Sequence, residues 1–245
     1  MRNVQGFAIE RVLEFQEQCR KAGESPAEAP EGWSISKADP MQMLLAAESL
    51  RIKPDYILRA YQFREDGNGN AFVYAVPKTA PFPDPQECQS RSPSHFLGPP
   101  VPPNALPTVA EAIKGDNSPW SYLQASILVR ELQEFGAMWH GVTWGTHWLL
   151  GANPLTMHRK KEVGTTSSLP DGIGRPSQWR WLKPKPRLWQ PQVVQSDSIA
   201  RVLFHTYSGY DRQTIYRHQD EYQTGSYCYK EKQSILARGP GGFIF

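Results

Sequence analysis

Cysteine is scarce in this sequence. The chain has three cysteines among 245 residues, and they lie far apart, at Cys19, Cys88 and Cys228. An odd number without any CxxC pair argues against a disulfide framework and against a zinc site. Residues 1–6 lack the apolar stretch of a secretory signal, and no apolar run approaches the roughly 18 residues of a membrane-spanning helix. These absences predict a soluble, cytoplasmic protein that does not enter a membrane.

Signatures of known chemistry are also missing. The sequence contains no GxSxG, no GxGxxG after a strand, no Walker loop and no HExxH. The run 66–70 resembles the opening of a calcium loop, but the glycine and the acid that such a loop needs are replaced by Ala71 and Pro77. We therefore expect no metal and no cofactor. An enzyme stays an alternative, because catalytic residues can converge from distant positions, and the candidates here are His140, His205, His218 and Asp220.

Proline and basic residues are unevenly distributed. Ten of the 22 prolines lie between residues 77 and 107, where they prevent a continuous helix or strand. Residues 1–150 carry 13 Lys and Arg against 17 Asp and Glu, whereas residues 151–245 carry 14 against 7. A basic C-terminal part in a chain of net charge +3 predicts one face that attracts anions.

Helical periodicity predicts three helices. The first covers residues 7–21, with apolar residues at helical spacing and Arg20 near its C-terminal end. A loop over 24–37 follows. A second helix is expected to begin with Asp39 as its cap and to end before Pro54, and a third begins with Ser118 as its cap and ends near Gly136.

The remaining pattern indicates an antiparallel sheet. Residues 56–64 and 71–76 are rich in β-forming side chains and flank a turn over 65–70, which predicts a hairpin. Short strands are expected at 178–182, 187–194, 199–207, 212–218, 226–230 and 233–238. The predicted fold is a single α+β domain over 1–245: a curved, mainly antiparallel sheet, open or barrel-like, with two or three helices packed on it. Helices and the hairpin occupy 1–76, a proline-rich loop 77–118, and the third helix with its strands 119–245.

Two histidines lie in neighbouring predicted strands. If residues 208–211 turn the chain, His205 lies opposite roughly Thr214, and His218 shares its face about 13 Å away, at 3.3 Å per residue. That distance excludes a shared metal or proton relay. Asp220 is expected in a solvated turn.

The strongest indication of function is the segment 175–189. Three tryptophans, Trp179, Trp181 and Trp189, are interleaved with basic residues, of which we select Arg180, Lys183, Lys185 and Arg187. Basic groups neutralise anionic partners, and exposed indoles anchor interfaces or stack on bases. Six nearby tyrosines belong to the same C-terminal region. The alternative is an edge strand with tryptophans inward and charges outward. We expect a non-enzymatic binding protein that holds a protein partner or a bulky anionic ligand on this face, with nucleic-acid binding as the first alternative and catalysis as the second.

Overall fold

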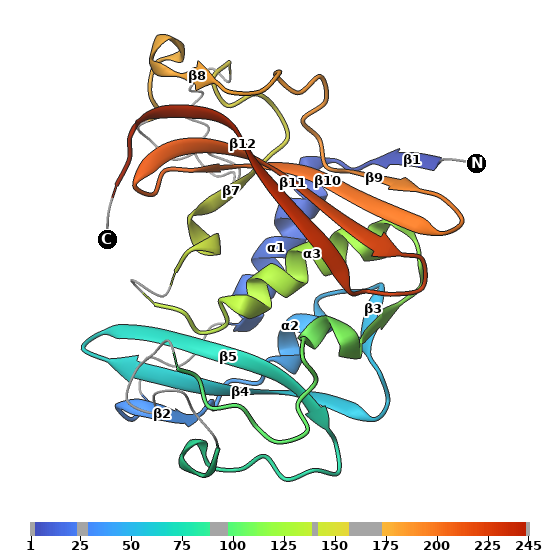
Figure 1. The fold of residues 1–245 in the computed structure, drawn as a ribbon, viewed down its shortest axis with the longest axis vertical. Coiled ribbons are helices and arrows are strands. Elements are labelled where there is room, and N and C mark those ends of the chain that lie inside the picture. The colour runs from blue at the N-terminus through green and yellow to red at the C-terminus, as the bar shows by residue number, and fades with distance from the viewer. Residues whose placement is uncertain (1–2, 24–28, 89–97, 139–141, 157–172, 244–245) are drawn as a thin grey trace. The chain divides into compact units, whose positions relative to one another are not determined.

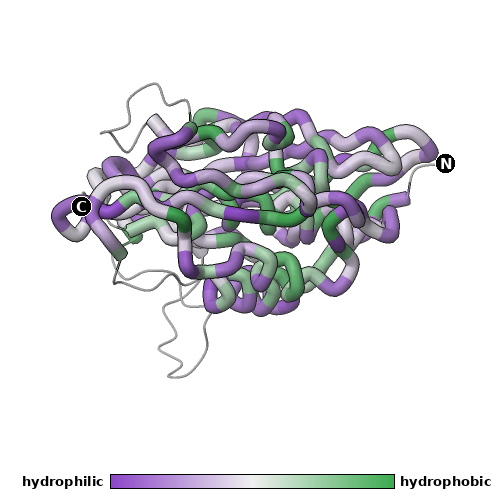
Figure 2. Tube along the Cα trace, turned by 90° about the horizontal axis from the view of Figure 1, so that it is seen from below, coloured by the Kyte–Doolittle hydropathy of each residue, from purple (hydrophilic) through white to green (hydrophobic). Residues whose placement is uncertain are grey.

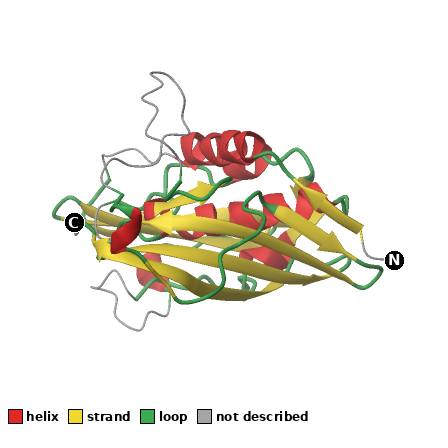
Figure 3. Ribbon diagram, turned by 90° about the horizontal axis from the view of Figure 1, so that it is seen from above, coloured by secondary structure: helices red, strands yellow, loops and turns green. Residues whose placement is uncertain are grey.

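The computed structural model describes residues 3–23, 29–88, 98–138, 142–156 and 173–243. Strands make up most of the regular structure, in agreement with the predicted α+β class (Figures 1 and 3). The chain forms two compact units, which we describe separately. The first consists of Met1–Glu14, Thr146–Thr224 and Tyr229–Phe245, and the second of Phe15–Gly145 and Gly225–Cys228. The expectation of a single domain stays a prediction.

The first unit is built on a curved antiparallel sheet. Its strands β1 (Asn3–Gly6), β9 (Gln192–Gln195), β10 (Ile199–Ser208), β11 (Arg212–Gln223), β12 (Tyr229–Gly241) and β8 (Arg180–Trp181) are hydrogen-bonded in that order. Strand β7 (His147–Leu150) pairs with the second half of β10, and β9 pairs with the first half. The β10 edge therefore changes partner near His205. Register between β10 and β11 runs from Ile199 opposite Gln223 to Ser208 opposite Thr214.

The second unit contains two small antiparallel sheets and most of the helices. Strands β2 (Gly32–Ile35), β4 (Tyr56–Glu65) and β5 (Asn68–Pro77) form one sheet, and β3 (Leu50–Ile52) pairs with β6 (Ile113–Gly115). Its helices are α2 (Met41–Leu45), α3 (Pro119–Gln133) and the part of α1 (Ile9–Gly23) from Phe15 onward. Short 3-10 helices occur at Pro85–Glu87 and Val109–Ala112 here, at Pro176–Gln178 in the first unit, and at Trp144–Thr146.

The predicted hairpin is confirmed, because its turn is specified locally. Strands β4 and β5 pair antiparallel from Tyr56 opposite Pro77 to Glu65 opposite Asn68. The two connecting residues, Asp66 and Gly67, have φ values of 46° and 78°. Positive φ at both positions is typical of the two-residue turn whose twist matches that of the paired strands. The turn is thus shorter than the predicted run 65–70.

Helix α3 is confirmed with its cap. The Ser118 hydroxyl accepts a hydrogen bond from the Ser121 N–H at 3.2 Å, and Pro119 occupies the first turn. Every residue from Trp120 to Leu132 is buried, so the helix is enclosed on all sides rather than along one stripe.

Four predictions at the element level are wrong. The second helix is only the five residues of α2, and residues 50–52 are drawn into a strand by pairing with β6. Part of the expected loop 24–37 is strand β2. The strand expected over 187–194 is replaced by the shorter β9, which begins after Pro191, a residue that lacks the N–H that a ladder requires. The two last predicted strands are one continuous strand, β12.

Hydrophobic stretches along the chain are short and interrupted by hydrophilic residues (Figure 2). Accordingly, none of the helices in the described ranges has the length and apolarity needed to cross a membrane.

Candidate functional site

The first tryptophan of segment 175–189, which we call the tryptophan segment, is buried. Trp179 is 8% exposed and packs in a core cluster with Leu150, Tyr207 and Leu236. Its Nε1 donates a hydrogen bond to the Gly174 carbonyl at 3.2 Å. Gly239 of β12 leaves room for the ring, because a Cβ there would lie 2.6 Å from Trp179 Cε2. Trp179 is therefore core, as the edge-strand alternative predicts.

The next two residues form the short edge strand β8. Arg180 pairs with Arg238 of β12, and Trp181 pairs with Ala237. Both the Leu182 and the Lys183 N–H then donate to the Leu236 carbonyl, at 2.8 and 3.2 Å. These bonds fix the backbone at the point where the segment leaves the sheet.

The other two tryptophans are half-buried. Trp181 and Trp189 contact each other edge to face, with ring centroids 6.4 Å apart, and both pack against the core cluster. The Lys185 ammonium lies 5.3 Å from the Trp181 ring centroid, a cation–π contact. Each of the three tryptophans is thus held mainly by packing inside its own unit.

The four predicted basic residues, in contrast, are all exposed. Two leucines between them are exposed as well, Leu182 at 46% and Leu188 at 65%. We call this set the basic strip: Arg180, Leu182, Lys183, Lys185, Arg187 and Leu188. Neither leucine was among the site residues predicted from the sequence, because the tryptophans dominate the hydrophobic pattern of residues 175–189.

The nearby tyrosines do not form one exposed face. Tyr207 lies in the core cluster under the tryptophans, whereas Tyr216 and Tyr222 lie on the opposite face of the sheet, since they pair with even-numbered residues of β10. Tyr222 is fully buried. Tyr207 and Tyr222 therefore belong to the core rather than to an exposed surface.

His205 lies directly beneath the tryptophan segment. Its ring centroid is 5.2 Å from that of Trp189, and its Nδ1 lies 3.4 Å from the Trp189 carbonyl. The side chain is 1% exposed, and within the described chain its Nε2 has no hydrogen-bond partner. Burial lowers the pKa of His205 to about 4. The imidazole is therefore neutral at physiological pH.

The predicted placement of His218 on the same sheet face as His205 is wrong. His205 pairs with Arg217, and His218 pairs with Phe204. Because side chains alternate along a strand, the two histidines occupy opposite faces of the sheet. Asp220 is also misplaced by the prediction: it lies within β11 and is fully buried.

His218 instead belongs to a buried polar chain. The Thr206 hydroxyl lies 2.9 Å from His218 Nε2 and 2.8 Å from His147 Nδ1. One hydroxyl carries one proton, so it donates to one imidazole and accepts from the other. Glu231 Oε1 lies 3.7 Å from His218 Nδ1. Thr206 is fully buried, so its hydroxyl is not accessible to act as a nucleophile. The hydrogen bonds through this hydroxyl couple the tautomers of His147 and His218.

The positions of the predicted catalytic residues give little support to the alternative that the protein is an enzyme. Its candidates do not converge: His205 and His218 face opposite sides of the sheet, and His140 lies outside the described residues. In the described ranges no three or more His, Cys, Asp or Glu residues are grouped so that they could hold a metal ion.

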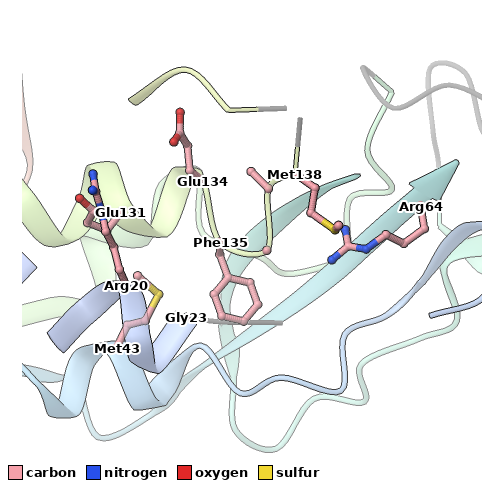
Figure 4. A pocket seen from close by; sticks show the side chains of 10 residues that line it. Arg20, Gly23, Met43, Arg64, Glu131, Glu134, Phe135 and Met138 are labelled. Carbon is pink, nitrogen blue, oxygen red and sulfur yellow. Dashed lines mark hydrogen bonds and ion pairs between the residues drawn. The ribbon is translucent and has the colours of Figure 1, made fainter. Parts of the chain in front are cut away.

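The second unit contains a cavity that the sequence analysis did not anticipate (Figure 4). It has a volume of about 390 Å³ and is lined by residues of α1, α2, β4 and the segment 131–138. No local sequence motif predicts this cavity, because its lining residues come from four separate parts of the chain.

Comparison with known proteins returned no matching family model, no matching curated protein and no matching solved structure.

Proposed function

We propose that this chain is a binding protein whose basic strip holds an acidic segment of another protein. The observation that carries the proposal is the exposure of Leu182 and Leu188 among four exposed cations. Apolar residues next to like charges are typical of surfaces that bury a partner side chain while the rim matches its charge. An acidic segment with apolar side chains is complementary to both features.

The strip is held in place before binding. Backbone bonds from Leu182 and Lys183 to Leu236 fix one end, and the packed Trp181 and Trp189 rings support the rest. A surface that is already ordered loses little conformational entropy on association. This favours a binding role over a segment that is merely solvated.

Nucleic-acid binding is the less favoured reading of the same surface. Single-stranded nucleic acids bind proteins largely by stacking bases on exposed aromatic faces. Here Trp179 is core, and Trp181 is contacted by both Trp189 and Lys185. The exposed apolar side chains of the strip, Leu182 and Leu188, are aliphatic, and aliphatic side chains offer bases no stacking surface.

We further propose that the protein works in a reducing compartment such as the cytoplasm. Support comes from its cysteines, each of which is a free thiol in the structure.

Peptide selection tests the binding proposal. Random displayed peptides are selected on the wild-type chain, and the affinity of the enriched peptides is then measured for the wild type and for a variant with Lys183→Glu, Lys185→Glu and Leu188→Ser. We expect enriched peptides to combine Asp or Glu with apolar residues, and to bind the variant at least about tenfold more weakly. The melting temperature of the variant should change little, because exposed substitutions contribute little to stability.

A matched control reverses two other exposed lysines, Lys230 and Lys232 of β12. They lie six to eight residues from Arg238, the partner of Arg180, which is about 20 Å or more along the strand. This control should bind the peptides like the wild type. Peptides that bind the triple variant as tightly as the wild type would refute the proposal. Stronger, strip-dependent binding of single-stranded oligo-dT would replace it with the nucleic-acid alternative.

A further inference from the structure

The cavity of the second unit has a cation available on one wall. Arg20 of α1 donates from Nε to Glu131 Oε2 at 3.0 Å, and Glu131 is only 5% exposed. Glu131 Oε1 in turn accepts hydrogen bonds from Gln16 at 2.6 Å and from the Trp144 indole at 2.7 Å. This carboxylate therefore holds the guanidinium of Arg20 through its Nε atom.

The outer edge of the same guanidinium is open. The Arg20 side chain is 41% exposed, and its two terminal amino groups make no hydrogen bond within the described part of the chain. Arg20 also lines the cavity. Two parallel N–H donors on a fixed guanidinium match the two oxygens of a carboxylate.

A second arginine lines the cavity from strand β4. Arg64 lies opposite Gly69 of β5, and a Cβ at position 69 would collide with its guanidinium. Its Nη1 donates to the Phe63 carbonyl at 2.9 Å. The residue is 7% exposed, and burial lowers its pKa. Arg64 therefore adds a positive charge to the lining of the cavity.

The wall between the two arginines is apolar. Phe135, Met43 and Met138 line it, and in Figure 4 the Phe135 ring lies between Arg20 and Arg64. Methionine side chains adapt their shape to an apolar ligand. A volume of about 390 Å³ is within the range of small-molecule sites.

The remaining acidic residue of the cavity does not oppose an anion strongly. Glu134 accepts hydrogen bonds from the backbone N–H groups of Thr143, Trp144 and Gly145, and from the Thr143 hydroxyl. Four donors compensate its charge within the protein, and they hold the carboxylate against the turn 143–145. The Glu134 carboxylate is therefore satisfied by hydrogen bonds, whereas the two terminal amino groups of Arg20 are available to a ligand.

We propose that this cavity is a binding site for a small carboxylic acid with an apolar body. The carboxylate binds the two terminal amino groups of Arg20, the body lies against Ala137 and Met138, the half-buried apolar side chains of the lining, and Arg64 adds a positive charge to the same lining. This site uses residues of the second unit only and does not depend on the basic strip.

Calorimetry on the full chain tests the proposal with benzoate, 3-phenylpropanoate and octanoate as probes. The matched neutral probe is 3-phenylpropanamide, which has the same body without the charge. We expect at least one acid to bind, and 3-phenylpropanamide and the Arg20→Gln variant each to lower the affinity by about tenfold or more. Arg51→Gln, which removes an exposed arginine of β3, should leave binding unchanged.

A second variant separates binding from stability, since Arg20→Gln removes the partner of a buried carboxylate. Ala137→Trp fills the cavity from its lining and leaves the Arg20–Glu131 pair in place. We expect it to abolish binding; if Arg20→Gln unfolds the chain, this result alone decides. Binding unchanged in a folded Arg20→Gln or in Ala137→Trp, equal affinity for acid and amide, or no binding of any acid would overturn the proposal.

Discussion

His205 should make the stability of the protein depend on pH. The residue is buried in β10 beneath Trp189, and within the described chain its Nε2 has no hydrogen-bond partner. Lowering the pH should destabilise the wild type more than the variant His205→Phe, which keeps a ring at this position but cannot titrate. In the wild type, protonation would place an uncompensated charge inside the unit.

The size and sign of this change in the free energy of unfolding follow from the pKa of His205 in the folded and the unfolded chain. The pKa falls from 6.5 to about 4, chiefly because of burial; the Trp189 carbonyl opposes this shift, and charge repulsion from Arg217 and His218 adds to it. Between these pH values the unfolded chain binds a proton that the folded chain does not. Stability is therefore complete above about pH 6.5 and falls as the pH approaches 4. At about 1.4 kcal/mol for each pH unit, the loss is about 3 kcal/mol.

Urea unfolding followed by tryptophan fluorescence measures this loss. The free energy of unfolding is determined from about pH 8 to about pH 4 for both chains. Other titrating groups contribute to both, so the difference between the two chains isolates His205. We expect the wild type to lose about 3 kcal/mol more than His205→Phe over this range. Equal pH dependence in the two chains would refute the reasoning.

Other substitutions test the packing described above. Thr206→Val should lower the free energy of unfolding by about 1–3 kcal/mol, because the buried His218 Nε2 loses its partner; Thr206→Ser, which keeps the hydroxyl, should retain the His147 and His218 tautomers seen by ¹⁵N NMR. Ser118→Ala should destabilise by about 1 kcal/mol in urea unfolding through loss of the α3 cap, and an unchanged midpoint would contradict the cap. Gly69→Ala should lower the melting temperature, since overpacking against Arg64 costs about 1–3 kcal/mol. Thiol titration of the denatured, unreduced chain should count all of its cysteines, Cys19, Cys88 and Cys228.

The sequence by itself determined the features that depend on near neighbours. Asp66 and Gly67 specify the hairpin because few residues adopt positive φ, and Ser118 with Pro119 specifies the start of α3. The α+β class followed from such signals together. The exposure of Arg180, Lys183, Lys185 and Arg187 was also predictable, since charged side chains are rarely buried without partners.

Which distant side chains contact each other depends on the packing of the folded chain. The β10–β11 register differs by three residues from that expected, since His205 lies opposite Arg217 and not Thr214. Because side chains alternate, a shift by an odd number of residues places His205 and His218 on opposite faces, and Thr206 bridges His147 and His218. Residues 50–52 became a strand because β6, some 60 residues later, supplies a partner. The cavity joins residues 20, 43, 64 and 131–138, and no local pattern encodes such a meeting, since it depends on how distant segments pack.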